Sequence, residues 1–299
     1  MVYLKRFRLP DVGAESRFLA GSRENKRTCY QSRYPFGVFL SWEVPELELE
    51  PVTIFCGGNG SGKTTILNLM GEKLGLHRGA VFNRSSFFGD YLELCREETT
   101  PAFTRQVREN SRVITSDDVF DYLLDLRCMN EGIDRRRREL LEEYTDARYA
   151  DFQLRSLEDV DRLRQVVLAK RGSGSRYVNR QLMKDVPEKS NGESAFLYFT
   201  REIREGGLYL LDEPENSLAP ALQEELARFL EDSVRFYRCQ LVISTHSPFL
   251  LSLRGARIYD LDARPVEVCP WTGLEHVQAY WRLFRERREE FEKEKPVGE

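Results

Sequence analysis

The sequence lacks the features of disulfide-rich, zinc-binding and membrane-spanning proteins. It contains no C-x-x-C pair, and no apolar run approaches the roughly 18 residues of a transmembrane helix. The first residues, 1–9, alternate apolar and polar like a half-buried strand and do not resemble a signal peptide. We therefore expect a reduced, cytoplasmic compartment without membrane insertion. The cysteines are widely scattered, at Cys29, Cys56, Cys95, Cys128, Cys239 and Cys269.

Charge balance and the spacing of possible metal ligands narrow the classes of function further. The chain has 45 basic and 49 acidic residues in 299, which argues against a protein that is basic throughout and coats nucleic acid, although a local basic patch remains compatible. No His/Asp/Glu cluster with metal-ligand spacing stands apart from the motifs below, so we expect no nuclease in this chain. Any cutting would then fall to a partner chain. No long heptad array is present, which excludes a long coiled-coil arm.

A glycine-rich motif, Gly57–Thr64, is the most informative feature present. It reads G-x-x-x-x-G-K-[ST], follows the apolar run Val52–Cys56 and precedes the helical stretch Thr65–Met70. Backbone N–H groups of such a loop cradle phosphates, and the helix N-terminus favours negative charge. A glycine turn with a chance lysine is the alternative, which the flanking strand and helix disfavour. The nucleotide-binding residues predicted here are Gly57, Asn59, Gly60, Ser61, Gly62, Lys63, Thr64 and Thr65.

A second apolar run ends in two acids, as in a Walker B strand. The run is Leu208–Glu213, with Asp212 and Glu213 at its end. We expect Asp212 and Thr64 to hold Mg²⁺ and Glu213 to polarise the attacking water. A solvated turn is the alternative, which the upstream P-loop makes unattractive. Lys63, Glu213 and His246 are the predicted catalytic residues, because His246 follows the apolar strand Gln240–Ser244 at a position suited to sensing a γ-phosphate.

The motif order resembles ATP-binding-cassette (ABC) ATPases, and more closely their RecF/SMC-like branch of AAA-family predicted ATPases. The relevant motifs are the P-loop, Ser190–Glu193, Leu210–Pro214 and Ser244–Pro248. With Ser32–Phe36 and Ile258–Asp262, the chain resembles a small predicted ATPase family of prokaryotes. The resemblance implies an α/β P-loop NTPase of ABC/SMC-head type, with a mixed sheet around the P-loop helix and a helical insert.

The resemblance also assigns a role to the segment before the Walker B strand. Residues 189–193 align with the family's L-S-G-G-Q signature, which contacts the γ-phosphate held by the opposite subunit. Ser190 and the Gly192 backbone would do so here. In the D-loop, residues 216–219, Ala219 replaces the acidic residue. The Q-loop stays open between Gln106 and the pair Ser116/Asp117 at the end of a strand at 112–115.

We expect one domain over residues 1–299, with a charged helical insert at 91–181 and a C-terminal helix and tail at 275–299. Within the insert, 118–126 reads as a helix, 156–159 as a helix start and 135–138 as part of a solvated helix face. Residues 170–180 read as a basic loop, either simply mobile or able to contact DNA or RNA. The apolar face of the C-terminal helix is expected to pack on the core.

The function predicted from these features is ATP hydrolysis in a head-to-tail homodimer with ATP and Mg²⁺ at the seam. Three biological settings stay open: a nucleic-acid-linked process such as genome maintenance or defence, the nucleotide-binding subunit of an ABC transporter, and a regulatory switch for an effector protein chain. The helical insert and the S-x-G-E form of the signature favour the first.

Overall fold

The computed structural model describes residues 1–22, 32–43, 46–150, 160–183 and 190–293. It divides into two compact units, one formed by Met1–Val119 with Asn191–Glu299 and the other by Phe120–Ser190. The expected insert is therefore narrower than 91–181, because residues 96–99 and 112–115 form strands within the first unit. The expected helix start at 156–159 lies outside the described residues.

The first unit is built around a seven-stranded sheet with the order β10-β9-β3-β8-β7-β6-β4. Neighbouring strands are parallel except for β10, which runs antiparallel to β9, so the sheet is mixed as expected. Every residue of β3, β7 and β8 is buried, which explains their nearly continuous apolar sequences. The strands are β3 Val52–Cys56, β4 His77–Arg78, β6 Arg112–Thr115, β7 Leu208–Asp212, β8 Gln240–Ser244, β9 Arg257–Asp260 and β10 Glu267–Val268.

A three-stranded antiparallel sheet, with the order β2-β1-β5, completes this unit. Its strands are β1 Leu4–Arg8, β2 Glu46–Glu48 and β5 Arg96–Thr99. The strand expected from the alternation at the start of the chain is thus confirmed as β1. The buried Gln240 side chain joins the two sheets, because its Oε1 accepts the N–H groups of Tyr3 and Leu4 at 2.7 and 2.8 Å.

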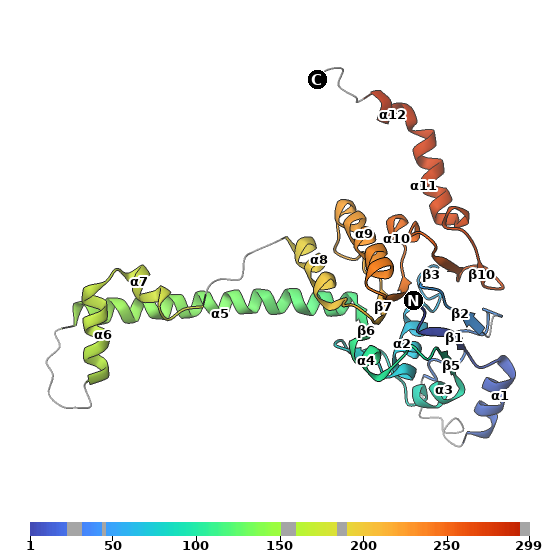
Figure 1. Ribbon diagram of the computed structural model, residues 1–299, viewed down its shortest axis with the longest axis horizontal. Helices are drawn as coiled ribbons and strands as arrows, with labels where there is room; N and C mark the ends of the chain where they lie inside the picture. Colours follow the sequence, from blue (N-terminus) through green and yellow to red (C-terminus); the bar gives the residue numbers. More distant parts are fainter. Residues whose placement is uncertain (23–31, 44–45, 151–159, 184–189, 294–299) are drawn as a thin grey trace. The chain divides into compact units, whose positions relative to one another are not determined.

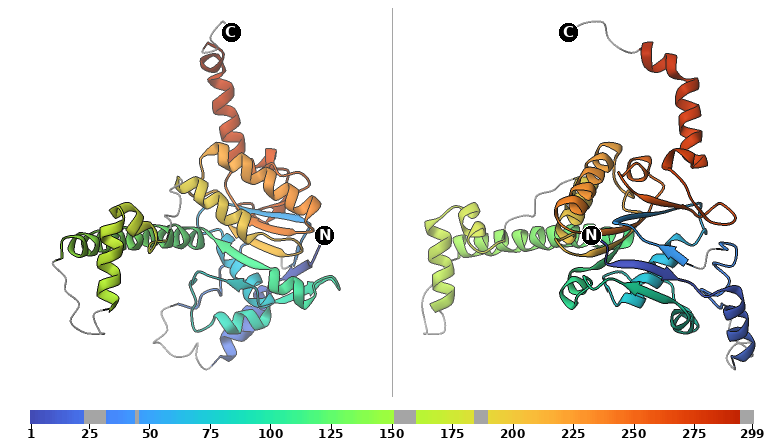
Figure 2. Two further views of the ribbon diagram at one scale, coloured as in Figure 1. Left: turned by 60° about the vertical axis from the view of Figure 1, so that its left-hand side comes forward. Right: turned by 45° about the vertical axis from the view of Figure 1, so that its right-hand side comes forward.

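Helices cover both faces of the large sheet (Figures 1 and 2). The connections through α2 and α9 run in opposite directions across the sheet, and right-handed crossovers then place the two helices on opposite faces. α8 packs beside α9, with the rings of Phe196 and Phe229 6.4 Å apart. The helices of this unit are α1 Val12–Gly21, α2 Lys63–Leu74, α3 Phe88–Leu94, α4 Arg105–Asn110, α8 Asn191–Glu202, α9 Pro220–Phe236, α10 Pro248–Leu251, the 3₁₀ turn Trp271–Gly273, α11 Glu275–Glu286 and α12 Arg288–Lys293.

The C-terminal helices differ from expectation. Val277 is buried, but Tyr280, Trp281, Phe284 and Phe291 are each about half exposed or more. The prediction that this apolar face packs on the core is therefore wrong. Phe284 and Phe291 instead contact each other edge to face across the α11–α12 junction, with ring centroids 5.9 Å apart.

The second unit consists of helices. They are α5 Ser116–Tyr149, which begins in the first unit, α6 Val160–Arg171 and α7 Gly174–Asn179. The predicted helix at 118–126 is part of α5. The prediction of a loop at 170–180 is wrong, because most of this segment is helical. Ser173 explains the error: its side chain caps α7 by accepting the N–H of Arg176, so the serine and glycines here end one helix and start another. Among the described residues, no helix is both long and apolar enough to cross a membrane.

Candidate nucleotide-binding site

The strand order brings the predicted motifs to one edge of the large sheet. β8 lies between β3 and β7, and all three run parallel. The carboxyl ends of parallel strands meet at one edge, where open α/β sheets bind their ligands. The P-loop after β3, Glu213 after β7 and His246 after β8 therefore converge, although almost 200 residues separate the first motif from the last.

The P-loop has the backbone conformation that its glycines permit. Gly60 and Gly62 have φ angles of 82° and 102°, in the left-handed region that favours glycine. A Cβ at Gly62 would also lie 3.1 Å from the rings of both Phe39 and Trp42. The indole N–H of Trp42 donates to the Ser61 carbonyl at 3.1 Å. The 32–43 segment thus packs against the loop and holds its shape.

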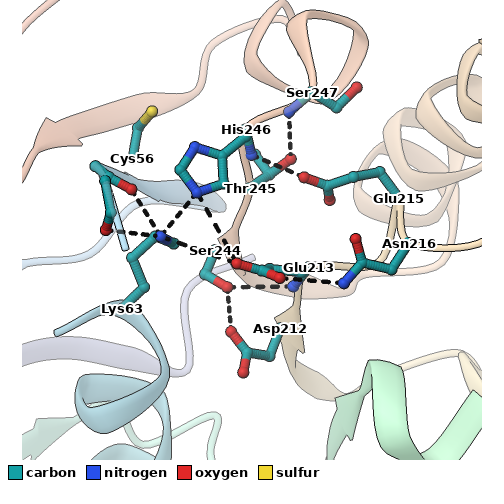
Figure 3. Close-up of polar contacts among 12 residues, drawn as sticks. Cys56, Lys63, Asp212, Glu213, Glu215, Asn216, Ser244, Thr245, His246 and Ser247 are labelled. Carbon is teal, nitrogen blue, oxygen red and sulfur yellow. Dashed lines mark hydrogen bonds and ion pairs between the residues drawn. The ribbon is translucent and has the colours of Figure 1, made fainter. Parts of the chain in front are cut away.

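Lys63, at the start of α2, lies at the centre of the site (Figure 3). Its buried Nζ donates to the carbonyl of Gly57 at 2.6 Å and lies 2.9 Å from Nε2 of His246. The Glu213 carboxylate is 3.9 Å from the same Nζ. The structure therefore brings together the three side chains predicted to be catalytic.

The surroundings of His246 favour the neutral form of its ring. Burial and then the Lys63 ammonium lower the pKa of His246 below 6.5. Because Lys63 can only donate, Nε2 of the neutral ring must accept, and the ring proton is then on Nδ1. The His246 backbone N–H donates to Oε1 of Glu215 at 2.7 Å.

Asp212 and Thr64 form the oxygen set predicted for a metal. The Asp212 carboxylate is buried at the end of β7, where it accepts hydrogen bonds from the hydroxyls of Ser244 and Thr64. Burial raises the pKa of this carboxyl, and the two hydroxyls act in the opposite direction. A carboxylate and a hydroxyl are hard oxygen donors of the kind that Mg²⁺ prefers.

Two adjoining cavities extend from these side chains. One, of about 340 Å³, is lined by residues 59–65 together with Tyr34, Val38 and Glu213. The other, of about 1040 Å³, shares Tyr34, Thr64 and Thr65 with the first and reaches Asp212, Ser116 and Asp117. Of the two Q-loop candidates, Ser116 and Asp117 line the larger cavity, whereas Gln106 lies in α4 and lines neither cavity.

The signature residues lie at the start of α8. Ser190 directly precedes the helix, and Gly192 is in its first turn. A Cβ at Gly192 would lie 2.8 Å from Leu222 of α9 and 3.3 Å from the Ser217 carbonyl, so this close packing requires glycine. Gly192 does not line either described P-loop cavity. Ala219, the replaced D-loop residue, begins α9 as its N-cap, and Lys189 lies outside the described residues.

Sequence reasoning missed several residues that reach the site from distant segments. Asp262 accepts the Gly58 N–H with both carboxylate oxygens, at 2.9 and 2.8 Å. His276 of α11 lies 3.8 Å from the Cys56 sulfur and edge-on to His246. Arg78 lines the larger cavity, and burial lowers the pKa of its guanidinium. Among these residues, only Asp262 could have been found from the sequence, because it is an acidic residue just after an apolar strand.

Comparison with known proteins gives a family match over part of the chain. Residues 188–252 match the family model described as "AAA domain, putative AbiEii toxin, Type IV TA system". This segment spans the signature, the β7 strand with Asp212 and the β8 strand leading to His246. This segment of the chain is therefore similar to an AAA domain. The predicted resemblance is thereby confirmed, and so is the α/β P-loop fold that it implied. Comparison with curated protein sequences gives no match.

Solved structures similar to this chain include SMC heads. The Pyrococcus furiosus Smc head with an extended coiled coil, bound to the C-terminal domain of ScpA, is 14% identical with a TM-score of 0.43, covering 96% of this chain and 100% of that one. The Thermotoga maritima SMC head is 13% identical with a TM-score of 0.38, covering 90% and 98%. A dimeric ATP-binding cassette bound to ADP and Pi is 16% identical with a TM-score of 0.35, covering 75% and 88%. Because these TM-scores are low, the fold assignment rests on the strand order and the P-loop.

Proposed function

We propose that this chain is an ATP-hydrolysing switch that forms a head-to-tail dimer around ATP and Mg²⁺. The observation that carries the proposal is the meeting of Lys63, Glu213 and His246 beside Asp212 and Thr64 at one sheet edge. A lysine, a carboxylate and a neutral imidazole within 4 Å of one another, next to a phosphate-binding loop, are the groups that phosphoryl transfer to water requires.

The P-loop supplies the triphosphate site. Backbone N–H groups of residues 59–65 line the smaller cavity at the N-terminus of α2, where the helix dipole favours negative charge. The Ser61 hydroxyl is buried here and has no hydrogen-bond partner among the described residues, which suits donation to a phosphate oxygen. Lys63 would neutralise the outer phosphates.

Thr64 and Asp212 would hold Mg²⁺, whose charge stabilises the developing negative charge of phosphoryl transfer. Glu213 is then the group that orients and polarises the attacking water. Its carboxylate is held near Lys63 by the Asn216 side-chain amide, which donates at 3.1 Å. His246, neutral and with its Nε2 directed at Lys63, would report whether the outer phosphate is present.

The dimer accounts for the signature. Gly192 lines neither P-loop cavity of its own chain, and its close packing against α9 leaves the start of α8 at a fixed position. In the proposed dimer, Ser190 and Gly192 contact the nucleotide of the other copy. ATP then joins the two copies and hydrolysis releases them. The dispersed cysteines support a reducing, cytoplasmic setting.

The decisive experiment uses Glu213→Gln. This variant should bind ATP, lose hydrolysis by about 100-fold or more and accumulate a dimer on size-exclusion chromatography with ATP and Mg²⁺. Lys63→Ala should bind no ATP and remain monomeric, and Glu224→Gln, an exposed glutamate on α9, serves as the matched control with wild-type behaviour. Normal turnover by Glu213→Gln would remove the general-base role. A monomeric Glu213→Gln with bound ATP would remove the dimer.

We further propose that the second unit contacts DNA or RNA. Between residues 162 and 180 the chain has six basic residues and no acidic one. Arg171, Arg176 and Arg180 are exposed there on and beside α7. A cluster of this kind suits the phosphate backbone, and its binding weakens with added salt.

One experiment tests nucleic-acid binding and also distinguishes this role from that of a switch acting on a protein partner. Replacing Arg171, Arg176 and Arg180 by Glu should abolish nucleic-acid binding at moderate salt without changing ATP hydrolysis in its absence. Replacing Arg136 by Glu, in a segment already paired with Glu139 and Glu143, is the matched control. Unchanged DNA and RNA binding by the triple variant would favour the effector-protein alternative.

A further inference from the structure

Two glutamates, two positions apart, approach His246 at different atoms (Figure 3). Oε1 of Glu213 lies 3.9 Å from Nε2 of the ring, whereas Oε1 of Glu215 accepts the His246 backbone N–H at 2.7 Å. Glu213 has a φ of 48°, and this left-handed turn followed by Pro214 brings both side chains back to the same residue. The proposed catalytic role uses only the first glutamate, which leaves the second without a function.

The surroundings of Glu215 are unusual for a carboxylate. Burial raises the pKa of Glu215, while N–H donors of His246 and of Glu215 itself and the Thr245 hydroxyl act against that rise. Its Oε2 is buried without a hydrogen-bond partner in the described part of the chain. A buried polar atom left unpaired costs free energy. Burying Glu215 therefore costs stability, which points to a functional role for its remaining hydrogen bonds.

The contacts of Glu215 and of the neighbouring residues of this turn fix the backbone that carries the His246 ring. Thr245 Oγ1 accepts the Ser247 N–H at 3.0 Å, and the Ser247 hydroxyl donates to Gln223 of α9 at 2.7 Å. Glu215 adds the connection from this turn to the end of β7, next to Asp212 and Glu213. Lys63 and Glu213 lie near Nε2 of the His246 ring, whereas Glu215 accepts a hydrogen bond from the backbone N–H of His246.

We infer that Glu215 is a positioning residue of the ATPase. It acts as a hydrogen-bond acceptor that ties the His246 peptide to the Walker B turn, so that Nε2 lies beside Lys63. The inference rests on the proposed function for its effect on hydrolysis, but the geometry it claims can be measured without hydrolysis. It distinguishes the two glutamates: Glu213 is needed for its charge, and Glu215 for its acceptor oxygen.

Paired substitutions test this distinction. Glu215→Ala removes the acceptor and should lower kcat by about 10- to 100-fold with ATP affinity nearly unchanged, because small misplacements of a catalytic group have effects of this size. Glu215→Gln keeps a carbonyl acceptor and should retain most of kcat. At position 213, in contrast, Glu213→Gln is itself expected to lower turnover by about 100-fold or more, because the charge is needed there. Equal loss in Glu215→Gln and Glu215→Ala, or full activity in Glu215→Ala, would overturn the inference.

A second measurement is independent of hydrolysis. The ¹⁵N resonances of the His246 ring, assigned by their loss in His246→Gln, should titrate at higher pH in Glu215→Ala, because a released ring leaves both its buried position and Lys63. In Glu215→Gln the titration should stay as in the wild type. An unchanged His246 titration in Glu215→Ala rules out the positioning role. Absence of hydrolysis by the wild-type chain would instead remove the proposed function and leave the titration to decide on Glu215.

Discussion

The two units of this chain are stabilised in different ways. In the first unit, one buried cluster extends from Tyr3 of the small sheet through Leu67 of α2 to Val266 beyond β9. In the second, the described cluster consists of Leu140, Tyr177 and Val178 with two partly buried neighbours, and a few further residues such as Val166 and Ala169 are buried. Long-range burial thus fixes the nucleotide site, whereas the helices beyond Val119 depend mainly on local contacts.

Local contacts in the second unit are of two kinds. Exposed ion pairs within a helix, such as Arg136 with Glu139, add little to stability. The more specific contact is between α5 and α7, where the Tyr144 hydroxyl donates to the Gly172 carbonyl at 3.1 Å and its ring lies 5.7 Å from that of Tyr177. We predict from this that the second unit can lose order without unfolding the first.

The largest expected effect comes from removing core volume in the first unit. Leu210 is fully buried in β7, so Leu210→Ala should reduce the free energy of unfolding by about 2–5 kcal/mol. Leu141→Ala, at a largely exposed leucine of α5, should change it by less than about 0.5 kcal/mol. Urea unfolding followed by tryptophan fluorescence measures this, because Trp42, Trp271 and Trp281 all lie in the first unit. Similar losses in both variants would contradict the division.

A smaller effect on the whole chain is expected for Tyr177→Ala. The substitution removes the largest side chain of the second unit's described core, so helical circular dichroism should fall at a lower temperature. The tryptophan transition, which reports on the first unit, should keep its midpoint. Phe120→Ala, at an exposed residue of α5, is the control. A matching shift of both signals in Tyr177→Ala would show that the units unfold as one.

The smallest effect is a pH dependence located in the first unit. Glu15 is buried and accepts the Gly37 N–H and the Tyr91 hydroxyl, and burial raises the pKa of its carboxyl above 4.5. The folded chain then keeps this proton to higher pH than the unfolded chain. Stability from this proton is complete below pH 4.5 and is lost as the pH rises through the folded pKa.

Glu15→Gln should therefore flatten stability against pH above 4.5, as measured by urea midpoints from pH 4.5 to 7.5. Glu43→Gln, at an exposed position near the same segment, should leave the slope unchanged. A steeper slope in Glu15→Gln would mean that the ionised carboxylate is the stabilising form.

The sequence was most informative where burial and motif coincide. The strands at 52–56 and 112–115 begin and end where predicted, and the strand predicted at 208–213 ends one residue earlier, because continuous apolar runs between polar turns admit little else. The P-loop, the Walker B acids and His246 could be predicted for the same reason. Arrangements that depend on contacts between distant segments could not, such as Glu215 under His246 or Asp262 against the P-loop.

Local composition was misleading in two places. Gly172 and Gly174 suggested a loop at 170–180, but the Ser173 cap lets α7 begin between them. The amphipathic pattern of α11 suggested core packing, but periodicity shows only which residues share a face and not what covers it. Both errors concern segments whose surroundings are set by the tertiary structure.

The pairing of β3 constrains the order in which the protein matures on the ribosome. Thr53, on the strand that leads into the P-loop, pairs with Val242 on one side and with Arg257 on the other. During synthesis from the N-terminus, the nucleotide-gripping loop is made early but lacks both flanking strands until nearly the whole chain has emerged. β3 therefore gains both of its neighbouring strands, and with them its place in the sheet, only late in translation.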